Sequence, residues 1–350
     1  MTRYLVVHPG ASWATADLFT GLYPALQRHG VEVVEYALDG RIAFAGSWLA
    51  SLYRRNKAKG MPKPTMADTL YLAEQGILER ALRFEVDWVL VIAGTYLMAD
   101  VYELMQRAGL RVAVLLTESP YDMEHEIEIA KRVNLVFTNE RTAVAAFAEY
   151  CPTYYYQHAI DPAKHDPAGE DDDTVAAHDV VFVGTGWQER IELLSAVDWD
   201  GIDMGLYGMW PLLGSRHHLR KHLRGGIVPN AKTAALYRRA KIGLNLHRTS
   251  VDFTRDAARI AGAASMNPRC YELAACGRFF ITDDRAEVAE VFGDAVPTFE
   301  TPAQLETLIR HYLAHDAERE RIAARLPGIV AGHNFYERAR MIVSALKQER

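Results

Sequence analysis

The chain has 350 residues, of which 49% are hydrophobic and 24% charged, and it carries a net charge of −6. Single cores stop growing near ~250–300 residues, so this length favours two domains. The acidic balance excludes a broad nucleic-acid-binding surface but leaves room for a local basic patch. No apolar run approaches the ~20 residues of a membrane span. The cysteines, Cys151, Cys270 and Cys276, lack metal-site spacing, which indicates reduced thiols in a cytoplasmic protein.

The first half of the chain alternates short runs of Val, Ile and Leu with segments of helix length. Near-continuous apolar runs in this arrangement are typical of a parallel sheet that helices cover on both faces. The N-terminal apolar run is too short for a signal peptide and is expected to be the first strand. The predicted strands are residues 4–10, 31–38, 88–94, 111–118 and 135–139.

A segment rich in proline, glycine and acidic residues, residues 157–178, interrupts this pattern and is expected to be a linker. The strand–helix pattern then begins again. Its predicted strands are residues 179–186, 202–208, 241–248, 278–282 and 295–299, with helices at 188–197 and 236–240 and from Pro302 onward. Two successive units of similar size predict an α/β protein with two doubly wound domains facing across a cleft. In such sheets ligands bind beyond the carboxyl ends of the strands.

Residues 267–282, NPRCYELAACGRFFIT, predict a short helix that leads into a strand. Asn267 is a favourable N-cap, Pro268 suits the first helical position, and Gly277 suits the residue just past the helix end. The start of a helix presents unpaired N–H groups and the positive end of the helix dipole, which together attract anions. The sequence therefore predicts an anion site at Asn267.

Two charged side chains, Arg269 and Glu272, stand one turn apart in this helix. Arg269 is a cation suited to phosphate, and the Glu272 carboxylate can accept two hydrogen bonds from a vicinal diol such as a ribose. An anion site beside a diol acceptor matches a nucleoside diphosphate. The alternative is a solvated i,i+3 ion pair, which stabilises a helix only slightly. The apolar run that follows favours the functional interpretation, because it predicts that the helix packs on the sheet.

Five segments together resemble the group 1 glycosyltransferases, and more narrowly their spore-maturation, CgeB-like branch. The resemblance covers most of residues 90–345, and it is specific only as a set. The segments are LLTESPYDMEHEIEIAKRVNLVFTN, DVVFVGTGWQERIELL, LYRRAKIGLNLHR, SMNPRCYELAACGRFFITDDRAEVAEVFG and HNFYERARMIVSAL.

The resemblance implies the GT-B fold, in which two Rossmann-like domains face each other and the second holds most of a nucleotide sugar. It assigns an acceptor domain to residues 1–165 and a donor domain to residues 175–334, with the helix at about 335–350 packed back on the first domain. In this fold helix dipoles and cationic side chains replace a metal, so neither a metal nor a bound cofactor is expected. The expected cosubstrate is a nucleotide sugar, with a UDP-sugar first among the candidates.

The same resemblance gives roles to particular residues. Glu272 would hold the nucleotide ribose, while Arg269 and the helix start at Asn267 would face the pyrophosphate. The other donor-site candidates are Gly184 and Gly186, where backbone could approach the donor, Arg190 as a further cation, Tyr207 and Gly208 near the base, and Asn245 at a strand end.

One position departs from the family pattern. Group 1 enzymes pair the ribose-binding glutamate with another glutamate eight positions earlier, and here that position is Ala264. The contact to the sugar hydroxyls is therefore missing or moved, and Asp252 and Asp256 in the preceding loop are candidates to replace it. This departure leaves the donor sugar open.

Loops that follow predicted strands supply the candidate catalytic residues. Glu118 and Asp122 are the first-domain carboxylates best placed to orient or deprotonate an acceptor hydroxyl, with helix capping around Pro120 as the alternative. His247 is the third candidate, although a single histidine at a strand end can equally be structural.

Two further segments have both a functional and a structural interpretation. The loop HPGAS, residues 8–12, brings Gly10 and Ser12 to where phosphate or acceptor could bind, or it is a plain turn. The segment RHHLRKHLRGG, residues 216–226, is expected to be a solvated helix, or the binding site of a polyanionic acceptor.

The predicted function is transfer of a hexose or related sugar from a nucleoside-diphosphate donor to an acceptor hydroxyl, with configuration retained by analogy with the family. The acceptor stays open among small molecules, glycans, proteins and modified DNA. Three alternatives remain: a phage-type enzyme that glycosylates hydroxymethylated DNA bases, a non-catalytic structural protein that binds sugar nucleotides, and a sugar-nucleotide epimerase. The acidic net charge argues against the DNA enzyme, and the basic segment argues for it.

Overall fold

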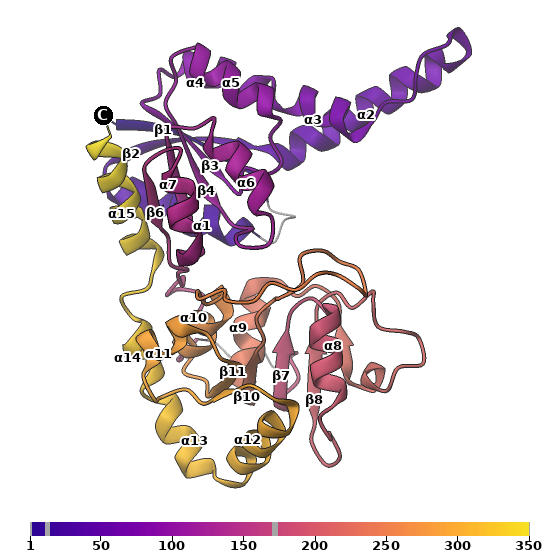
Figure 1. The fold of residues 1–350 in the computed structure, drawn as a ribbon, viewed down its shortest axis with the longest axis vertical. Coiled ribbons are helices and arrows are strands. Elements are labelled where there is room, and N and C mark those ends of the chain that lie inside the picture. Colours follow the sequence, from indigo (N-terminus) through magenta and orange to yellow (C-terminus); the bar gives the residue numbers. More distant parts are fainter. Residues whose placement is uncertain (1, 11–14, 170–173, 350) are drawn as a thin grey trace. The chain divides into compact units, whose positions relative to one another are not determined.

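The computed structural model describes residues 2–10, 15–169 and 174–349. Its internal contacts divide the chain into two compact units, Met1–Tyr156 with Tyr336–Arg350, and Gln157–Phe335. Each unit contains one six-stranded sheet with helices around it (Figure 1). The segment 157–178, which the sequence predicts as a linker, therefore lies within the second unit.

The sheet of the first unit is entirely parallel and has the strand order β2-β1-β3-β4-β5-β6. Its strands are β1 Thr2–His8, β2 Val31–Ala37, β3 Trp88–Ile92, β4 Val112–Leu116, β5 Leu135–Thr138 and β6 Thr153–Tyr155. The first five confirm the predicted strands. The sequence analysis missed β6, because this short edge strand has half-buried side chains and no apolar run.

Helices surround this sheet, and the last helix of the chain is one of them. They are α1 Ala16–Arg28, α2 Leu38–Asn56, α3 Met66–Glu74, α4 Gly76–Arg83, α5 Ala99–Arg107, α6 Met123–Ala130, α7 Val144–Ala148 and α15 Phe335–Gln348, with short 3-10 turns η1 Lys57–Lys59 and η2 Arg141–Ala143. Helix α15 is tied to the sheet where the buried Trp88 indole N–H donates to the Leu346 carbonyl at 3.1 Å.

The sheet of the second unit is also parallel, with the order β12-β11-β10-β7-β8-β9. Its strands are β7 His178–Val183, β8 Met204–Tyr207, β9 Leu223–Gly225, β10 Ala240–Asn245, β11 Phe280–Asp283 and β12 Thr298–Phe299. The expectation of a helix over residues 216–226 is wrong. A 3-10 turn, η3 His218–His222, leads there directly into the edge strand β9.

Helices cover both faces of this second sheet. They are α8 Gln188–Ser195, α9 Asn230–Arg239, α10 Pro268–Ala275, α11 Ala286–Phe292, α12 Pro302–Ala314, α13 Asp316–Ala323 and α14 Leu326–Val330. Strand β7 shows the division: Val181 and Val183 belong to the core with α9, α10, α11 and α14, whereas Val180 and Phe182 belong to the core with α8, α12 and α13. The predicted α/β class with parallel sheets is confirmed.

The described residues contain neither a membrane-spanning helix nor a metal-binding cluster. No helix among them combines the length and apolarity needed to span a bilayer. Nor do any three of their His, Cys, Asp or Glu side chains form a group that could hold a metal ion.

Candidate functional site

The helix start expected at Asn267 is present at the carboxyl edge of the second sheet. Asn267 is the N-cap of α10, Pro268 is its first residue, and Gly277 follows its end with a φ of 63°. The Asn267 side chain makes no capping hydrogen bond. Its oxygen is buried and has no partner among the described residues. The first turn of α10 is therefore not capped by its own N-cap side chain.

Arg269 and Glu272 do not form the ion pair that was the structural alternative. The Arg269 Nε–H donates to the Val183 carbonyl at the end of β7, which fixes the stem of this side chain. Its two terminal nitrogens have no partner within residues 2–10, 15–169 and 174–349. Glu272 is only 7% exposed, yet its carboxylate has no hydrogen bond or ion pair in the same residues.

Such an arrangement is costly for the protein alone. A mostly enclosed carboxylate loses part of its hydration, and no described protein group replaces the hydrogen bonds it loses. Buried polar groups in folded proteins are otherwise nearly always hydrogen-bonded. The Glu272 carboxylate, one turn beyond a half-buried cation and an uncapped helix start, is therefore suited to a ligand that supplies hydrogen-bond donors.

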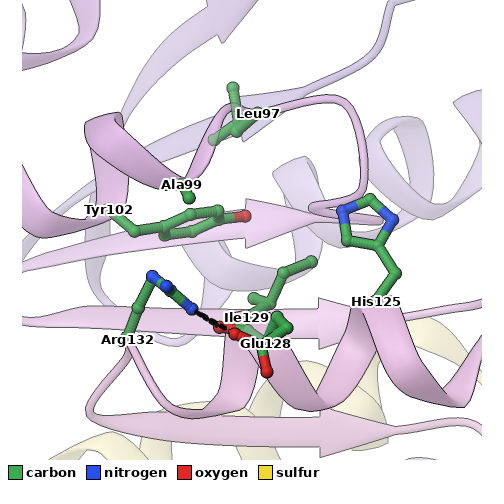
Figure 2. A pocket seen from close by; sticks show the side chains of 7 residues that line it. All are labelled: Leu97, Ala99, Tyr102, His125, Glu128, Ile129 and Arg132. Atoms are coloured by element: carbon green, nitrogen blue, oxygen red, sulfur yellow. Dashed lines mark hydrogen bonds and ion pairs between the residues drawn. The ribbon is translucent and has the colours of Figure 1, made fainter.

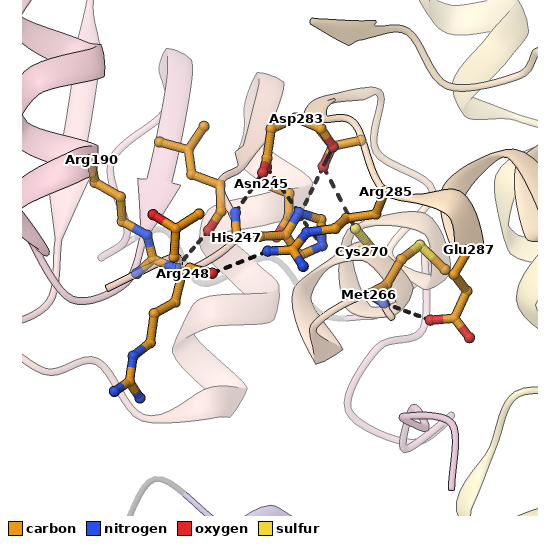
Figure 3. A network of polar contacts seen from close by, with 12 residues as sticks. Arg190, Asn245, His247, Arg248, Met266, Cys270, Asp283, Arg285 and Glu287 are labelled. Carbon is orange, nitrogen blue, oxygen red and sulfur yellow. Dashed lines mark hydrogen bonds and ion pairs between the residues drawn. The ribbon is translucent and has the colours of Figure 1, made fainter. Parts of the chain in front are cut away.

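The backbone before α10 is held by Glu287, which sequence reasoning missed. This side chain is fully buried at the start of α11. Its carboxylate accepts a hydrogen bond from the Met266 N–H at 2.6 Å and another from the Gln157 amide at 2.8 Å (Figure 3 shows the Met266 bond). In the sequence Glu287 looks like any polar residue of a surface helix, so no local signal could have identified it.

Ala264, the position that departs from the family pattern, lies in the same segment before α10. The Ala264 carbonyl accepts a hydrogen bond from the Glu287 backbone N–H at 3.1 Å. Of the two suggested replacements, Asp252 is exposed and accepts hydrogen bonds from Thr254 at 3.0 and 2.6 Å. Asp256 is exposed as well. Neither carboxylate therefore has the burial that distinguishes Glu272.

The predicted donor-site glycines are required by packing within the unit. A Cβ at Gly186 would lie 2.3 Å from the Trp210 ring. A Cβ at Gly208 would lie 2.2 Å from the Gly184 carbonyl, and Gly208 has a φ of 110°. The space on the Cβ side of Gly186 and Gly208 is thus filled by protein, and their roles at the donor site stay predictions.

Arg190 and Tyr207 are also engaged by neighbouring protein groups. The Arg190 guanidinium is buried and donates to the carbonyls of Thr185 at 2.9 Å and Leu246 at 2.6 Å. It joins the loops after β7 and β10 and keeps its positive charge, so its role as a further cation at the donor site stays a prediction. The Tyr207 hydroxyl lies 2.9 Å from His178 Nε2, and burial raises the pKa of this tyrosine.

Two arginines of the basic segment 216–226 are held by neighbouring protein groups. The Arg220 guanidinium donates to the carbonyls of Gly214 and Leu213 at 3.0 and 2.7 Å. Arg224 pairs with Asp203 at 3.1 Å. Asp203 therefore balances the charge of Arg224, whereas Arg220 keeps its charge.

His247 belongs to a buried polar network at the ends of β10 and β11 (Figure 3). Its Nδ1 lies 2.9 Å from the Asp283 carboxylate, and its Nε2 lies 3.4 Å from the Asn245 amide nitrogen. Asn245 also donates to the Thr282 hydroxyl at 2.9 Å, which lies 3.9 Å from the Cys270 sulfur of α10. Both ring nitrogens of His247 thus face protein groups, which favours its structural interpretation.

The neighbours of Asp283 favour the ionised form of its carboxyl group. Burial raises the pKa of Asp283, but the facing His247 and its hydrogen bonds lower it more, so the net pKa lies below the ordinary value. Beside the network is a cavity of about 310 Å³. It is lined by residues that include Glu189, Arg190, His247, Asp283, Asp284 and Glu300.

In the first unit, Glu118 and Asp122 follow β4 as predicted. Asp122 is exposed and occupies the N-cap of α6 without a capping bond, so the capping alternative is wrong for its side chain. It lies 3.3 Å from His125 instead. The residue that holds this loop is the buried Glu126, which accepts hydrogen bonds from the Glu118 N–H at 2.9 Å and from the Ser119 hydroxyl. Burial raises the pKa of Glu126 to about 7.

Gly10, a remaining first-unit candidate, has little space around it. Gly10 has a φ of 114°, and a Cβ there would lie 1.9 Å from the Asp39 carboxyl group. Ser12 lies outside the described residues. A cavity of about 30 Å³ between α5 and α6, lined by Tyr102 and His125 among others, is too small for a sugar (Figure 2).

Comparison with known proteins gives consistent matches. Residues 173–344 match the model of a family described as glycosyl transferase-like. The spore protein CgeB of Bacillus subtilis (strain 168) is 24% identical over 251 residues, which span 69% of this chain and 76% of that protein.

Two solved structures align with nearly the whole chain. Sucrose-phosphate synthase of Thermosynechococcus elongatus has a TM-score of 0.66 and 11% identity, and 99% of each chain is covered. Anabaena Alr3699/HepE, in complex with UDP, has a TM-score of 0.63 and 13% identity over 99% of this chain and 100% of that one. At these identities the structures show a common fold.

Proposed function

We infer the function of this chain from its membership in the glycosyl transferase-like family and from its GT-B fold, both of which the sequence had led us to expect. The protein is a glycosyltransferase. We propose that its donor is a UDP-sugar, that its acceptor group is a hydroxyl, and that the donor binds at the start of α10. The choice of UDP is supported by Anabaena HepE, whose structures contain UDP and UDP-glucose.

The observation that carries the proposal is the buried, unpartnered carboxylate of Glu272. A ribose offers two adjacent hydroxyl donors, and a carboxylate can accept both at once. Binding would therefore give Glu272 the hydrogen bonds that no described protein group supplies. The residue is mostly enclosed by protein, at 7% exposure, so the ribose would displace little water from it.

Arg269 and the helix start would act on the diphosphate in the same complex. The Nε bond to Val183 holds the guanidinium while its terminal nitrogens stay available. As the bond to the sugar breaks, negative charge grows on the leaving diphosphate, and fixed donors beside it stabilise this charge more strongly than in the ground state. We further propose that the configuration at the anomeric carbon is retained. We also propose that cationic side chains take the role that a metal ion has in other enzymes. Both points follow from the family resemblance.

Calorimetric titration with UDP-glucose tests this site directly. The Glu272→Ala variant should bind at least about 30-fold more weakly, because the diol loses a charge-assisted partner contributing about 2 kcal/mol. Glu320→Ala is the matched control, since Glu320 is an exposed glutamate of α13 in the same unit. Unchanged affinity of a folded Glu272→Ala protein would refute the assignment. A thermal-shift screen of UDP-, GDP-, ADP- and dTDP-sugars would identify the base.

The alternatives differ in what they do to the donor. An epimerase converts a UDP-sugar without an acceptor, and a binding protein leaves it intact with every acceptor. A DNA glycosyltransferase needs hydroxymethylated DNA as its acceptor. Arg220 is held by the Gly214 carbonyl and Arg224 by Asp203, so these contacts do not favour a DNA-binding function. Product analysis with and without acceptors therefore separates all four functions.

A further inference from the structure

Helices α2 and α3 form a helical hairpin at one side of the first unit, here called the α2–α3 arm (residues 38–74). Figure 1 shows the two helices running together away from the sheet of that unit. Their seam is built from small and apolar side chains: Ala45 and Leu49 of α2 are buried, as are Thr69 and Ala73 of α3. The seam holds the arm together without using its outer sides.

Large apolar side chains are concentrated on those outer sides. Of the eleven exposed large hydrophobic residues in the described chain, five lie in this arm. They are Phe44, Trp48, Met66, Tyr71 and Leu72. Phe44 is 73% exposed and Trp48 is 47% exposed. Exposed aromatic groups gathered on one element indicate a surface that is covered in use.

The sequence of α2 places two of these aromatic groups beside a cation. Phe44 and Trp48 are one turn apart, and Arg55 follows two turns later on the same side of the helix. This side is displaced by about 100° from the seam at Ala45 and Leu49, since neighbouring positions differ by that angle. It therefore faces neither α3 nor the sheet of its own unit.

The tip of the arm is strongly basic. Residues 54–63, RRNKAKGMPK, contain five Lys and Arg and no acidic residue, so the other 340 residues carry −6 − 5 = −11. The five are Arg54, Arg55, Lys57, Lys59 and Lys63, and none has an ion-pair partner among the described residues. An acidic protein thus places an uncompensated positive cluster on a projecting element.

We propose that the α2–α3 arm docks the protein on a membrane surface rich in anionic lipid. A helix that carries aromatic groups beside Lys and Arg is suited to the boundary between headgroups and acyl chains. There the aromatic rings enter the apolar layer while the cations meet lipid phosphates. A nucleic acid would use the cations but leave Phe44 and Trp48 in water, and a second copy would bring the same positive charge against itself.

Vesicle co-sedimentation of the full chain tests the proposal. The wild type should bind vesicles of phosphatidylglycerol and phosphatidylcholine, bind pure phosphatidylcholine weakly, and lose affinity as salt is raised. Because each basic residue near the surface changes the partition about 5-fold, Arg54→Glu, Lys57→Glu and Lys59→Glu together should weaken binding at least about 100-fold. Phe44→Ala with Trp48→Ala should weaken it at unchanged charge.

A charge-matched control isolates the location of these residues. Arg216→Glu, Lys221→Glu and Lys232→Glu change the net charge equally, at exposed positions of the second unit, and should leave vesicle binding unchanged. Equal loss in this control, or equal binding of the arm variants and the wild type, would overturn the proposal. Two other results would overturn it as well. The arm substitutions could abolish binding to duplex DNA in a gel shift, or dimerisation in ultracentrifugation, while vesicle binding persists. The affinity for UDP-glucose is measured without vesicles. The test of the donor site is therefore independent of the test of membrane docking.

Discussion

Buried carboxylates have two different tasks in this chain. In the first unit, Glu74 accepts a hydrogen bond from the Met98 N–H at 3.0 Å, and Glu126 accepts one from the Glu118 N–H at 2.9 Å. Each holds a loop that follows a strand, and burial raises the pKa of each to about 7. Glu272 in the second unit holds no such loop with its carboxylate. Buried glutamates thus hold loops in the first unit, whereas we propose that the buried glutamate of the second unit binds a ligand.

Glu126→Gln should change how stability depends on pH. The raised pKa means that the folded protein keeps the Glu126 proton while an unfolded chain releases it near pH 4.5. Its contribution is therefore complete below about pH 4.5 and is lost as pH rises through about 7. Glutamine stays neutral, so at pH 8 the variant should be more stable than the wild type, by up to about 3 kcal/mol.

Urea denaturation at pH 5 and pH 8 measures this difference. Glu124→Gln is the control, because Glu124 is an exposed glutamate of the same helix, α6. A Glu126→Gln protein that loses as much stability between the two pH values as the wild type would contradict the assignment.

Glu272→Gln should separate stability from ligand binding. The Glu272 carboxylate makes no hydrogen bond or ion pair with the described residues, and glutamine has nearly the same shape, so the ligand-free variant should melt no lower than the wild type. The same variant should bind UDP-glucose more weakly, because an amide presents only one acceptor oxygen to the diol. Thermal unfolding without and with donor shows both effects. A clear fall in the melting temperature of the ligand-free variant would show that Glu272 is a structural residue.

At the scale of elements, the loops after β7 and β8 depend on a close approach of backbone. Gly208→Ala should destabilise the second unit by about 2–4 kcal/mol, because the new Cβ would collide with the Gly184 carbonyl and a φ of 110° strains any other residue. Gly214→Ala is the control, since a Cβ there meets nothing within 4 Å. Equal unfolding free energies for the two variants would show that the loop relaxes at no cost.

The elements that the sequence predicted are those whose periodicity is local. Apolar runs identified the buried strands, and the cap, proline and glycine around α10 identified that helix. The short edge strands β6 and β9 carry no such signal. Arg269 and Glu272 could be proposed as site residues because their spacing is visible in one helix. Glu126 and Glu287 were not, because their burial depends on loops and helices that meet them only in the folded unit.

At the scale of the whole molecule, α15 follows the second unit in sequence but belongs mainly to the first. Most of α15 lies in the first unit, where Ile342 and Leu346 are fully buried and Leu346 accepts the Trp88 bond. The chain therefore completes its first unit only after the second has been made. Two units with separate cores should unfold in two calorimetric transitions, and UDP-glucose should raise only the transition of Gln157–Phe335.

Ile342→Ala tests this division. It removes a fully buried side chain and should destabilise the first unit by about 2–5 kcal/mol. Ser344→Ala, at an exposed position of the same helix, should change nothing measurable. The substitution should lower only the transition of the first unit, which UDP-glucose does not raise. The affinity for UDP-glucose should stay at the wild-type value. If Ile342→Ala instead lowered the transition that the donor raises, the two units would share one cooperative core, and the assignment of the donor site to the second unit alone would fail.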